Sequence, residues 1–299
     1  MHKQLAIGFS ILLVFSLTAT AKDFAVFYLG GQSNMDGYGY LKELPESLNK
    51  PMNGVMIFHG NTSPDNTPVD GKGVWSTLRP GHGVGFQSDG KANTYSDRFG
   101  VELSFAQKLK ALNPDMNIAL IKYSRGGTSI DISAAGNFGC WDPDFVGENG
   151  VNQYDHFLAT MRNALSVSDI DGDGKEDKLI PTGILWMQGE SDAHSKEVAQ
   201  KYEANLKQMI DLFRAALRVE DLSAVVGRIS DSGNDDDGKV WDFGDIVRDA
   251  QASFVKNDSS AALVTSTDFY DYSDKWHYDG KGYIDLGEQF AIKMYELMK

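Results

Sequence analysis

Five short runs of almost unbroken apolar residues constrain the fold of this chain more than any other feature of its sequence. They span residues 24–29, 118–123, 183–187, 224–229 and 262–265, and turn residues bound each of them. Strands that are covered on both faces have this pattern, whereas half-exposed strands alternate apolar and polar residues. The runs therefore predict a parallel sheet whose two faces are both buried.

Amphipathic patterns separate these runs. Apolar residues recur at helical spacing in four segments, residues 101–112, 198–213, 245–255 and 284–298. An alternation of strands and helices is typical of a parallel sheet with helices on both faces. The length of the chain suits one large α/β domain, and no repeat or break in composition divides it. We expect a single domain over residues 22–299.

Two segments interrupt the alternation. Residues 36–98 and residues 131–152 are rich in Gly, Pro, Asn and Asp. Long connections without secondary structure of their own run over the surface and often carry function. We expect both segments to be surface excursions that shape a substrate cleft.

The first residues have the layout of a cleavable secretory signal. Met-His-Lys precedes an apolar run over residues 5–17, and Ala19 and Ala21 provide a small-residue cleavage site. The run is shorter than the roughly 20 residues that span a bilayer. We expect residues 1–21 to be removed during export, which leaves a soluble periplasmic or secreted protein without a membrane anchor.

The charge of the chain limits its partners. The formal net charge is -14, so nucleic acid and anionic membrane surfaces are poor partners. A neutral substrate such as a glycan suits this charge better.

A serine follows the first apolar run directly. Gly30 and Gly31 allow a sharp turn there, which places Ser33 at the carboxyl end of a parallel strand, where open α/β sheets build their sites. A serine becomes a nucleophile when an imidazole accepts its proton and a third group fixes the tautomer of that imidazole. Among the six histidines, His277 has a carboxylate three residues earlier, Asp274, in a turn after the last run. We expect Ser33 as nucleophile, His277 as base and Asp274 as orienting group; a structural glycine turn and a solvated Asp-x-x-His turn are the plainer alternatives.

Two other strand ends offer donors for the oxyanion of an acyl-transfer intermediate. Gly126 and Gly127 follow the second run, and their backbone N–H groups can approach a ligand without interference from a side chain. Gln188 follows the third run and carries a side-chain amide. We expect the backbone of Ser33 and Gly126 to form the hole together with Gln188, with Gly127 as the alternative to Gly126. An ordinary strand-to-loop turn would also explain the glycine pair.

Taken in order along the chain, these segments resemble the conserved blocks of the SGNH hydrolases. Within that superfamily they resemble the carbohydrate acetylesterases, which include acetylxylan esterases and sialate O-acetylesterases. The matching blocks are residues 31–35, 126–128, 188–190 and 274–277. The resemblance implies a three-layer α/β/α flavodoxin-like fold with a five-stranded parallel sheet, a Ser-His-Asp triad, and no metal or other cofactor in catalysis. Gln188 stands in the block where the superfamily usually has Asn.

The resemblance predicts a serine esterase that removes O-acetyl groups from carbohydrate through an acyl-enzyme. The compact length favours the acetylxylan esterase type, because sialate O-acetylesterases often carry inserted domains. A sialate O-acetylesterase is the alternative within the class, and a non-catalytic carbohydrate-binding protein on the same fold is the alternative from another class. The side chains expected to contact substrate are Gln32, Asn34, Arg125, Glu190 and Trp276. An ionised Glu190 can only accept hydrogen bonds, so we also expect it to brace its loop.

A separate acidic loop resembles the start of a calcium-binding loop. Oxygen-bearing residues alternate along it and a glycine stands at the tight turn. The expected ligands are Asp169, Asp171, Asp173 and Asp177. The twelfth position is Ile180 rather than the usual Glu, so a solvated acidic loop is the alternative to a structural calcium site.

Overall fold

The computed structural model describes residues 21–62, 64, 67–148 and 150–299. Except for Ala21, the predicted signal segment lies outside the described residues. None of the helices in the described part combines the length and the apolar composition that crossing a bilayer requires.

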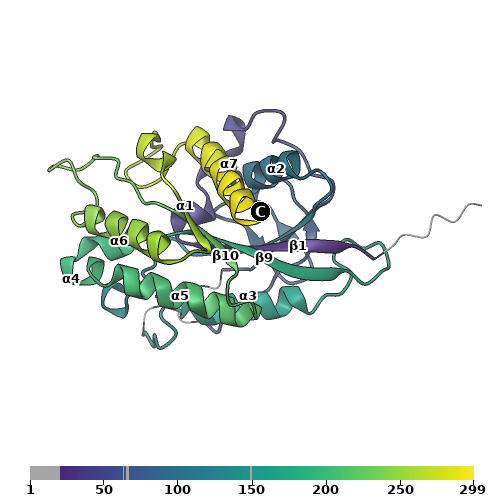
Figure 1. The fold of residues 1–299 in the computed structure, drawn as a ribbon, viewed down its shortest axis with the longest axis horizontal. Coiled ribbons are helices and arrows are strands. Elements are labelled where there is room, and N and C mark those ends of the chain that lie inside the picture. The colour runs from purple at the N-terminus through teal and green to yellow at the C-terminus, as the bar shows by residue number, and fades with distance from the viewer. Residues whose placement is uncertain (1–20, 63, 65–66, 149) are drawn as a thin grey trace, which may run out of the picture.

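A seven-stranded sheet forms the centre of the molecule (Figure 1). The strand order is β11-β10-β9-β1-β8-β3-β4. All neighbouring strands are parallel except β4, which pairs antiparallel with β3 at one edge. The strands are β1 (Asp23–Gly31), β3 (Val55–His59), β4 (Ser76–Thr77), β8 (Asn117–Ser124), β9 (Lys178–Met187), β10 (Ser223–Gly227) and β11 (Ala261–Val264). The five predicted strands are present as β1, β8, β9, β10 and β11.

Helices cover both faces of the sheet, which confirms the three-layer α/β/α fold. One face carries α2 (Glu102–Leu112) and α7 (Gly280–Leu297); the other carries α3 (Gln153–Leu165), α5 (Tyr202–Leu217) and α6 (Gly244–Asn257) (Figure 1). The four predicted helical segments are present, although the second is divided into α4 (Lys196–Ala199) and α5. Sequence reasoning did not identify α3.

The segment at residues 36–98 is the main departure from expectation, because it is not only a surface excursion. It contains β3, whose five residues are all buried and pair in parallel with β8. The run Val55–His59 is short, and the turn-rich residues on both sides hide it in the sequence. Two small antiparallel sheets of two strands each accompany it, β2 (Gly39–Tyr40) with β7 (Arg98–Phe99) and β5 (Gln87–Ser88) with β6 (Asn93–Thr94).

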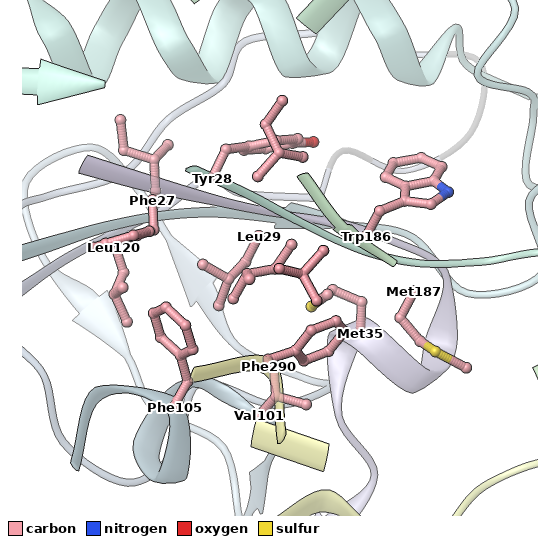
Figure 2. Packing of buried hydrophobic residues seen from close by; sticks show 14 of the residues in the cluster. Phe27, Tyr28, Leu29, Met35, Val101, Phe105, Leu120, Trp186, Met187 and Phe290 are labelled. Carbon is pink, nitrogen blue, oxygen red and sulfur yellow. The ribbon is translucent and has the colours of Figure 1, made fainter. Parts of the chain in front are cut away.

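Helices cover both faces of the central strand β1, and this burial is the reason why its sequence is almost continuously apolar. The ring of Phe27 packs on Phe105 of α2, with 5.2 Å between ring centroids. The next residue, Tyr28, packs on Phe213 of α5 at 5.1 Å. Figure 2 shows Tyr28 and Trp186 on one side of the strands and Phe105 on the other. Since both helical layers rest on β1, replacing Phe27 by Ala should cost about 3–5 kcal/mol of unfolding free energy.

Strand register then decides where the functional loops meet. Gly31, the last residue of β1, lies opposite Ser124 of β8 and Met187 of β9. The chain order reverses around β1, with β8 on one side and β9 on the other. Ligand sites of open α/β sheets form outside the carboxyl ends of strands at such a reversal.

Candidate active site

Ser33 begins a four-residue helix, α1 (Ser33–Asp36), immediately after the turn that ends β1. The turn depends on Gly31, whose φ of 141° suits glycine, and a Cβ there would lie 2.0 Å from the carbonyl oxygen of Met187. The side chain of Ser33 is 7% exposed and lines a cleft of about 560 Å³. The strand end thus presents the hydroxyl to a ligand-sized cavity.

His277 lines the same cleft and is held by Asp274. Its Nδ1 lies 2.7 Å from Asp274 Oδ2, so Nδ1 carries the hydrogen and Nε2 remains an acceptor. Partial burial acts to raise the pKa of Asp274, but hydrogen bonds from the His277 ring and from two backbone N–H groups outweigh it and hold that pKa below its ordinary value. Tyr38 stacks on the imidazole with 3.6 Å between centroids and an angle of 5°. Within the described residues no hydrogen bond joins His277 to Ser33, as is common in substrate-free sites.

The loop after β8 brings its glycine pair against Ser33. A Cβ on Gly126 would lie 3.3 Å from the Cβ of Ser33, so the backbone of Gly126 is packed beside the nucleophile. Arg125 N–H donates to the carbonyl of Gly31 at 3.1 Å and ties this loop to the end of β1. Gly126 and Gly127 both line the cleft.

Gln188 does not lie where the sequence suggested. Its side chain is fully buried, and its Nε2 donates to the carbonyl of Thr128 at 3.1 Å and to Asp192 Oδ2 at 2.6 Å. Its Oε1 accepts from the hydroxyl of Tyr202 at 2.9 Å. Both amide hydrogens are therefore committed to protein acceptors, and the expectation that Gln188 donates to the oxyanion is not met. The residue joins the loops that follow β8 and β9.

Asn34 connects the turn that carries Ser33 to the segment that carries His277. Its Nδ2 donates to Glu190 Oε1 at 2.8 Å and to the carbonyl of Trp276 at 3.2 Å. Its Oδ1 accepts from the backbone N–H of Tyr278 at 3.4 Å and from the hydroxyl of Tyr283 at 2.8 Å. The amide thereby holds the residues on both sides of His277 and has no donor or acceptor left for a substrate.

The other expected contact residues divide between the cleft wall and its support. Gln32, Arg125 and Trp276 line the cleft. With its amide nitrogen turned toward Glu190 Oε2, Gln32 donates to that oxygen and to the carbonyl of Thr128, each at 3.2 Å. Glu190 lies behind the wall, and its burial raises its pKa to about 7 against the hydrogen bond from Asn34. This placement agrees with Glu190 bracing its loop.

Sequence reasoning missed several residues of the cleft. Asp36 lines it, and burial raises the pKa of its carboxyl to about 6, against the nearby charges of Lys122 and Arg125. Residues of the 131–152 segment and of the loop after β10 complete the wall; they include Asn137, Phe138 and Trp241. No local pattern marks these residues, because distant segments bring them together.

His194 is a second histidine on the cleft wall. Its ring lies edge-on to Trp241, with 5.1 Å between centroids. Within the described residues no carboxylate is hydrogen-bonded to this ring. Its surroundings therefore lack the orienting group that His277 has.

The acidic loop lies apart from the cleft. Carboxylate oxygens of Asp169, Asp171 and Asp177 come within 4.8 Å of one another. Asp173 is outside this group and binds Lys22 Nζ at 2.8 Å, and Lys22 also binds Asp171. Within the described residues the buried Asp177 Oδ1 has no hydrogen-bond partner. Three of the four expected ligands are therefore close enough to share an ion.

Comparisons with known proteins identify the family of this chain and solved structures that share its fold. Residues 23–296 match the family model described as "Carbohydrate esterase, sialic acid-specific acetylesterase". A solved protein from Arabidopsis thaliana has 19% sequence identity over 93% of this chain and 99% of its own, with a TM-score of 0.64. A carbohydrate acetylesterase from Xanthomonas citri has 18% identity over 92% of this chain and 56% of its own, with a TM-score of 0.61. NanS has 16% identity over 93% and 98%, with a TM-score of 0.56. At these identities the structures show a shared fold, and no curated protein sequence matches the chain.

Proposed function

This chain belongs to the carbohydrate esterase family of sialic acid-specific acetylesterases, and from that premise we propose that it removes O-acetyl groups from carbohydrate with a Ser33-His277-Asp274 triad. The family makes it a carboxylic ester hydrolase that acts on acetylated carbohydrate, which disfavours a non-catalytic binding protein. The observation that carries the triad is the contact of 2.7 Å between Asp274 and His277, on the wall of the cleft that Ser33 also lines.

The reaction proceeds through an acyl-enzyme. His277 Nε2 accepts the hydroxyl proton while Ser33 Oγ attacks the acetyl carbonyl, and the same proton passes to the departing sugar oxygen. Water then attacks the acetyl-serine with His277 again as base, which releases acetate and restores Ser33. Asp274 keeps the hydrogen on Nδ1 and stabilises the imidazolium that forms in each step.

Backbone donors stabilise the oxyanion. The N–H groups of Ser33 and Gly126 are the proposed donors, because Gly126 is packed against the nucleophile and both residues line the cleft. Gly127 is the alternative to Gly126. The loss of one such donor typically reduces kcat by about 10²–10³-fold.

Two acetylated substrates remain in competition. One is an acetylxylan-type polysaccharide. The family description favours acetylated sialic acid, and Arg125 on the cleft wall offers a cation to a sugar carboxylate.

Release of acetate tests both the mechanism and the substrate. The parent enzyme and Ser33→Ala should be compared on acetylated xylan, acetylated mannan and O-acetyl sialic acid. We expect Ser33→Ala to melt like the parent and to lose roughly 10⁴-fold or more of its activity. Substantial activity in a folded Ser33→Ala variant would refute the mechanism.

Two further proposals concern the mature protein rather than the reaction. We propose that the signal at residues 1–21 directs export to the periplasm or the medium, which suits an enzyme that acts on polysaccharide. We also propose a structural calcium ion at Asp169, Asp171 and Asp177, whose hard oxygen donors suit calcium. It would take no part in catalysis.

A further inference from the structure

A second cavity adjoins the catalytic cleft, and we call it the side cavity. Its volume is about 680 Å³, so both cavities fall in the range of roughly 300–1,000 Å³ that ligand sites occupy. His194 and Trp276 line both the cleft and the side cavity. The remaining lining residues of the side cavity are Asp235, Asp236, Asp237, Lys239, Val240, Asp242 and Lys275.

Trp276 forms a fixed apolar surface between the two cavities. Trp276 is 48% exposed, which is unusual for a residue with so large an aromatic ring. Its backbone N–H donates to Asp274 at 2.7 Å and its carbonyl accepts from Asn34 at 3.2 Å. These bonds hold the backbone of Trp276 beside His277, and the exposed indole offers a broad surface on which a ligand ring can stack.

The charge of the side cavity is acidic. Lys275 pairs with Asp235, and Lys239 lies 3.6 Å from Asp245. Asp236, Asp237 and Asp242 have no ion pair among the described residues. Their carboxylates can accept hydrogen bonds from hydroxyl groups, whereas they repel a ligand that carries a carboxylate of its own.

We propose that the side cavity binds a neutral sugar residue adjacent to the one that carries the acetyl group. Trp276 stacks on that residue and the unpaired aspartates accept hydrogen bonds from its hydroxyl groups. The inference rests on the proposed function, since it places the acetylated sugar at Ser33. It commits the enzyme to neutral oligosaccharides or polysaccharides and against substrates in which the neighbouring sugar is a uronic or sialic acid.

The first test measures dependence on substrate length. For each variant the value of kcat/KM on an acetylated neutral disaccharide is divided by its kcat/KM on a small ester, the corresponding acetylated monosaccharide. We expect this ratio to fall about two- to tenfold in Trp276→Ala and to be largely restored in Trp276→Phe, since the ring of Phe can also stack on a sugar. Phe269→Ala is the matched control, because Phe269 is 88% exposed and outside both cavities, and its ratio should equal that of the parent.

The second test measures selection by charge. The same ratio is taken for a disaccharide whose unacetylated sugar is a uronic acid. Replacing Asp236 and Asp242 together by Asn, or raising the salt concentration, should improve use of this substrate about fivefold and leave the neutral disaccharide almost unaffected.

The outcomes separate the two proposals. If the parent hydrolyses the small ester but Trp276→Ala keeps the parent ratio, the side cavity does not bind sugar. If the acidic disaccharide is used as well as the neutral one and the Asn substitutions change nothing, the charge selection is wrong. If no acetyl ester is hydrolysed at all, the proposed function itself fails.

Discussion

Two turns of this protein are built in the same way and do different things. In the turn at Asp274, one carboxylate oxygen accepts the backbone N–H groups of Trp276 and His277 at 2.7 and 2.8 Å. In the acidic loop, Asp169 likewise accepts the N–H groups of Gly172 and Asp173 at 2.8 and 3.2 Å. In both turns an Asp side chain accepts hydrogen bonds from backbone N–H groups that would otherwise have no partner. A short stretch of sequence is enough to specify such a turn.

The difference lies in the second oxygen and in the tertiary partners. Asp274 Oδ2 is directed at an imidazole on a cleft wall, and Asn34 fixes the backbone on both sides of that imidazole. In Asp169 the second oxygen accepts another backbone N–H, that of Gly174 at 2.9 Å. Lys22, whose side chain is 37% exposed, pairs with the neighbouring carboxylates of Asp171 and Asp173. The catalytic role proposed for the Asp274 turn therefore depends on an oxygen that is free to hold the nearby imidazole, and on distant Asn34, which fixes the backbone around it.

Replacing His277 should have the largest effect of all the changes in the Asp274 turn. Because the members of a triad act as a unit, His277→Ala should lose about 10⁴-fold of kcat or more, and the double variant with Ser33→Ala should be no worse than Ser33→Ala alone. Asp274→Asn should cost less, because the imidazole remains but loses its favoured tautomer. The measurement is acetate release from a small acetyl ester.

His194→Ala provides the matched control, since His194 lies on the same cleft wall without a carboxylate partner, and its loss should be mild. A collapse in His194→Ala while His277→Ala stays active would exchange their roles.

The tertiary support of the catalytic turn can be removed separately. Asn34→Ala deletes four hydrogen bonds and leaves buried Glu190 without its Asn34 donor, which should lower the free energy of unfolding by about 2–4 kcal/mol. It should lower kcat about 10–100-fold with little change in KM, because it loosens the base rather than the substrate. Denaturant unfolding and steady-state kinetics measure these effects. Asn49→Ala, on an exposed turn, should change neither quantity, and an Asn34→Ala enzyme with parental kcat would show that the clamp is dispensable.

The pH dependence of stability should distinguish the two regions by sign. The folded pKa of Glu190, about 7, lies above its unfolded value, so the folded state holds a proton that the unfolded state releases. The associated stability is complete below about pH 4.5 and is lost as pH rises toward 7. Between pH 5 and 8 the free energy of unfolding of Glu190→Gln should therefore fall by about 2–3 kcal/mol less than that of the parent. Glu220→Gln, on an exposed loop, is the control; equal pH slopes in Glu190→Gln and the parent would contradict the buried proton.

In the acidic loop the contribution to stability changes with pH in the opposite direction. The side-chain hydrogen bond from Lys22 is the main cause that lowers the pKa of Asp173. This contribution to stability is present above the unfolded pKa and is lost as pH falls through the folded pKa. Acid should therefore weaken the loop in the pH range where the buried carboxyl of Glu190 is protonated and uncharged.

Calcium should have the smallest effect and should concern only the acidic loop. At a free concentration of about ten times Kd, native-state binding adds about 1.4 kcal/mol. This corresponds to a rise in Tm of roughly 2–3 °C for a chain of this size. Chelator should reverse the rise, Asp177→Asn should abolish it, and Lys22→Ala should enlarge it by removing the competing ammonium. A melting curve that ignores both calcium and chelator leaves the solvated-loop interpretation.

The sequence predicted those elements of the fold that have a clear local pattern. An apolar run such as Phe24–Leu29 predicts a strand whose two faces are buried. The helical spacing of apolar residues from Val101 to Leu112 predicts a helix. The run at Val55–His59 obeys the same rule, but five residues inside a turn-rich segment are too few to stand out. Only pairing with β8 makes it a strand.

The candidate site divides along the same line. The sequence alone was enough to propose Ser33, Asp274 and His277, because a glycine turn after a strand and an Asp turn three residues before a histidine are local patterns. The folded structure was needed to see that Gln188 holds two loops together, that Asn34 binds the residues on both sides of His277 and that Tyr38 stacks on its ring. These roles depend on the direction of a buried donor or ring toward residues far away in the chain. Spacing along the sequence carries no information about that direction.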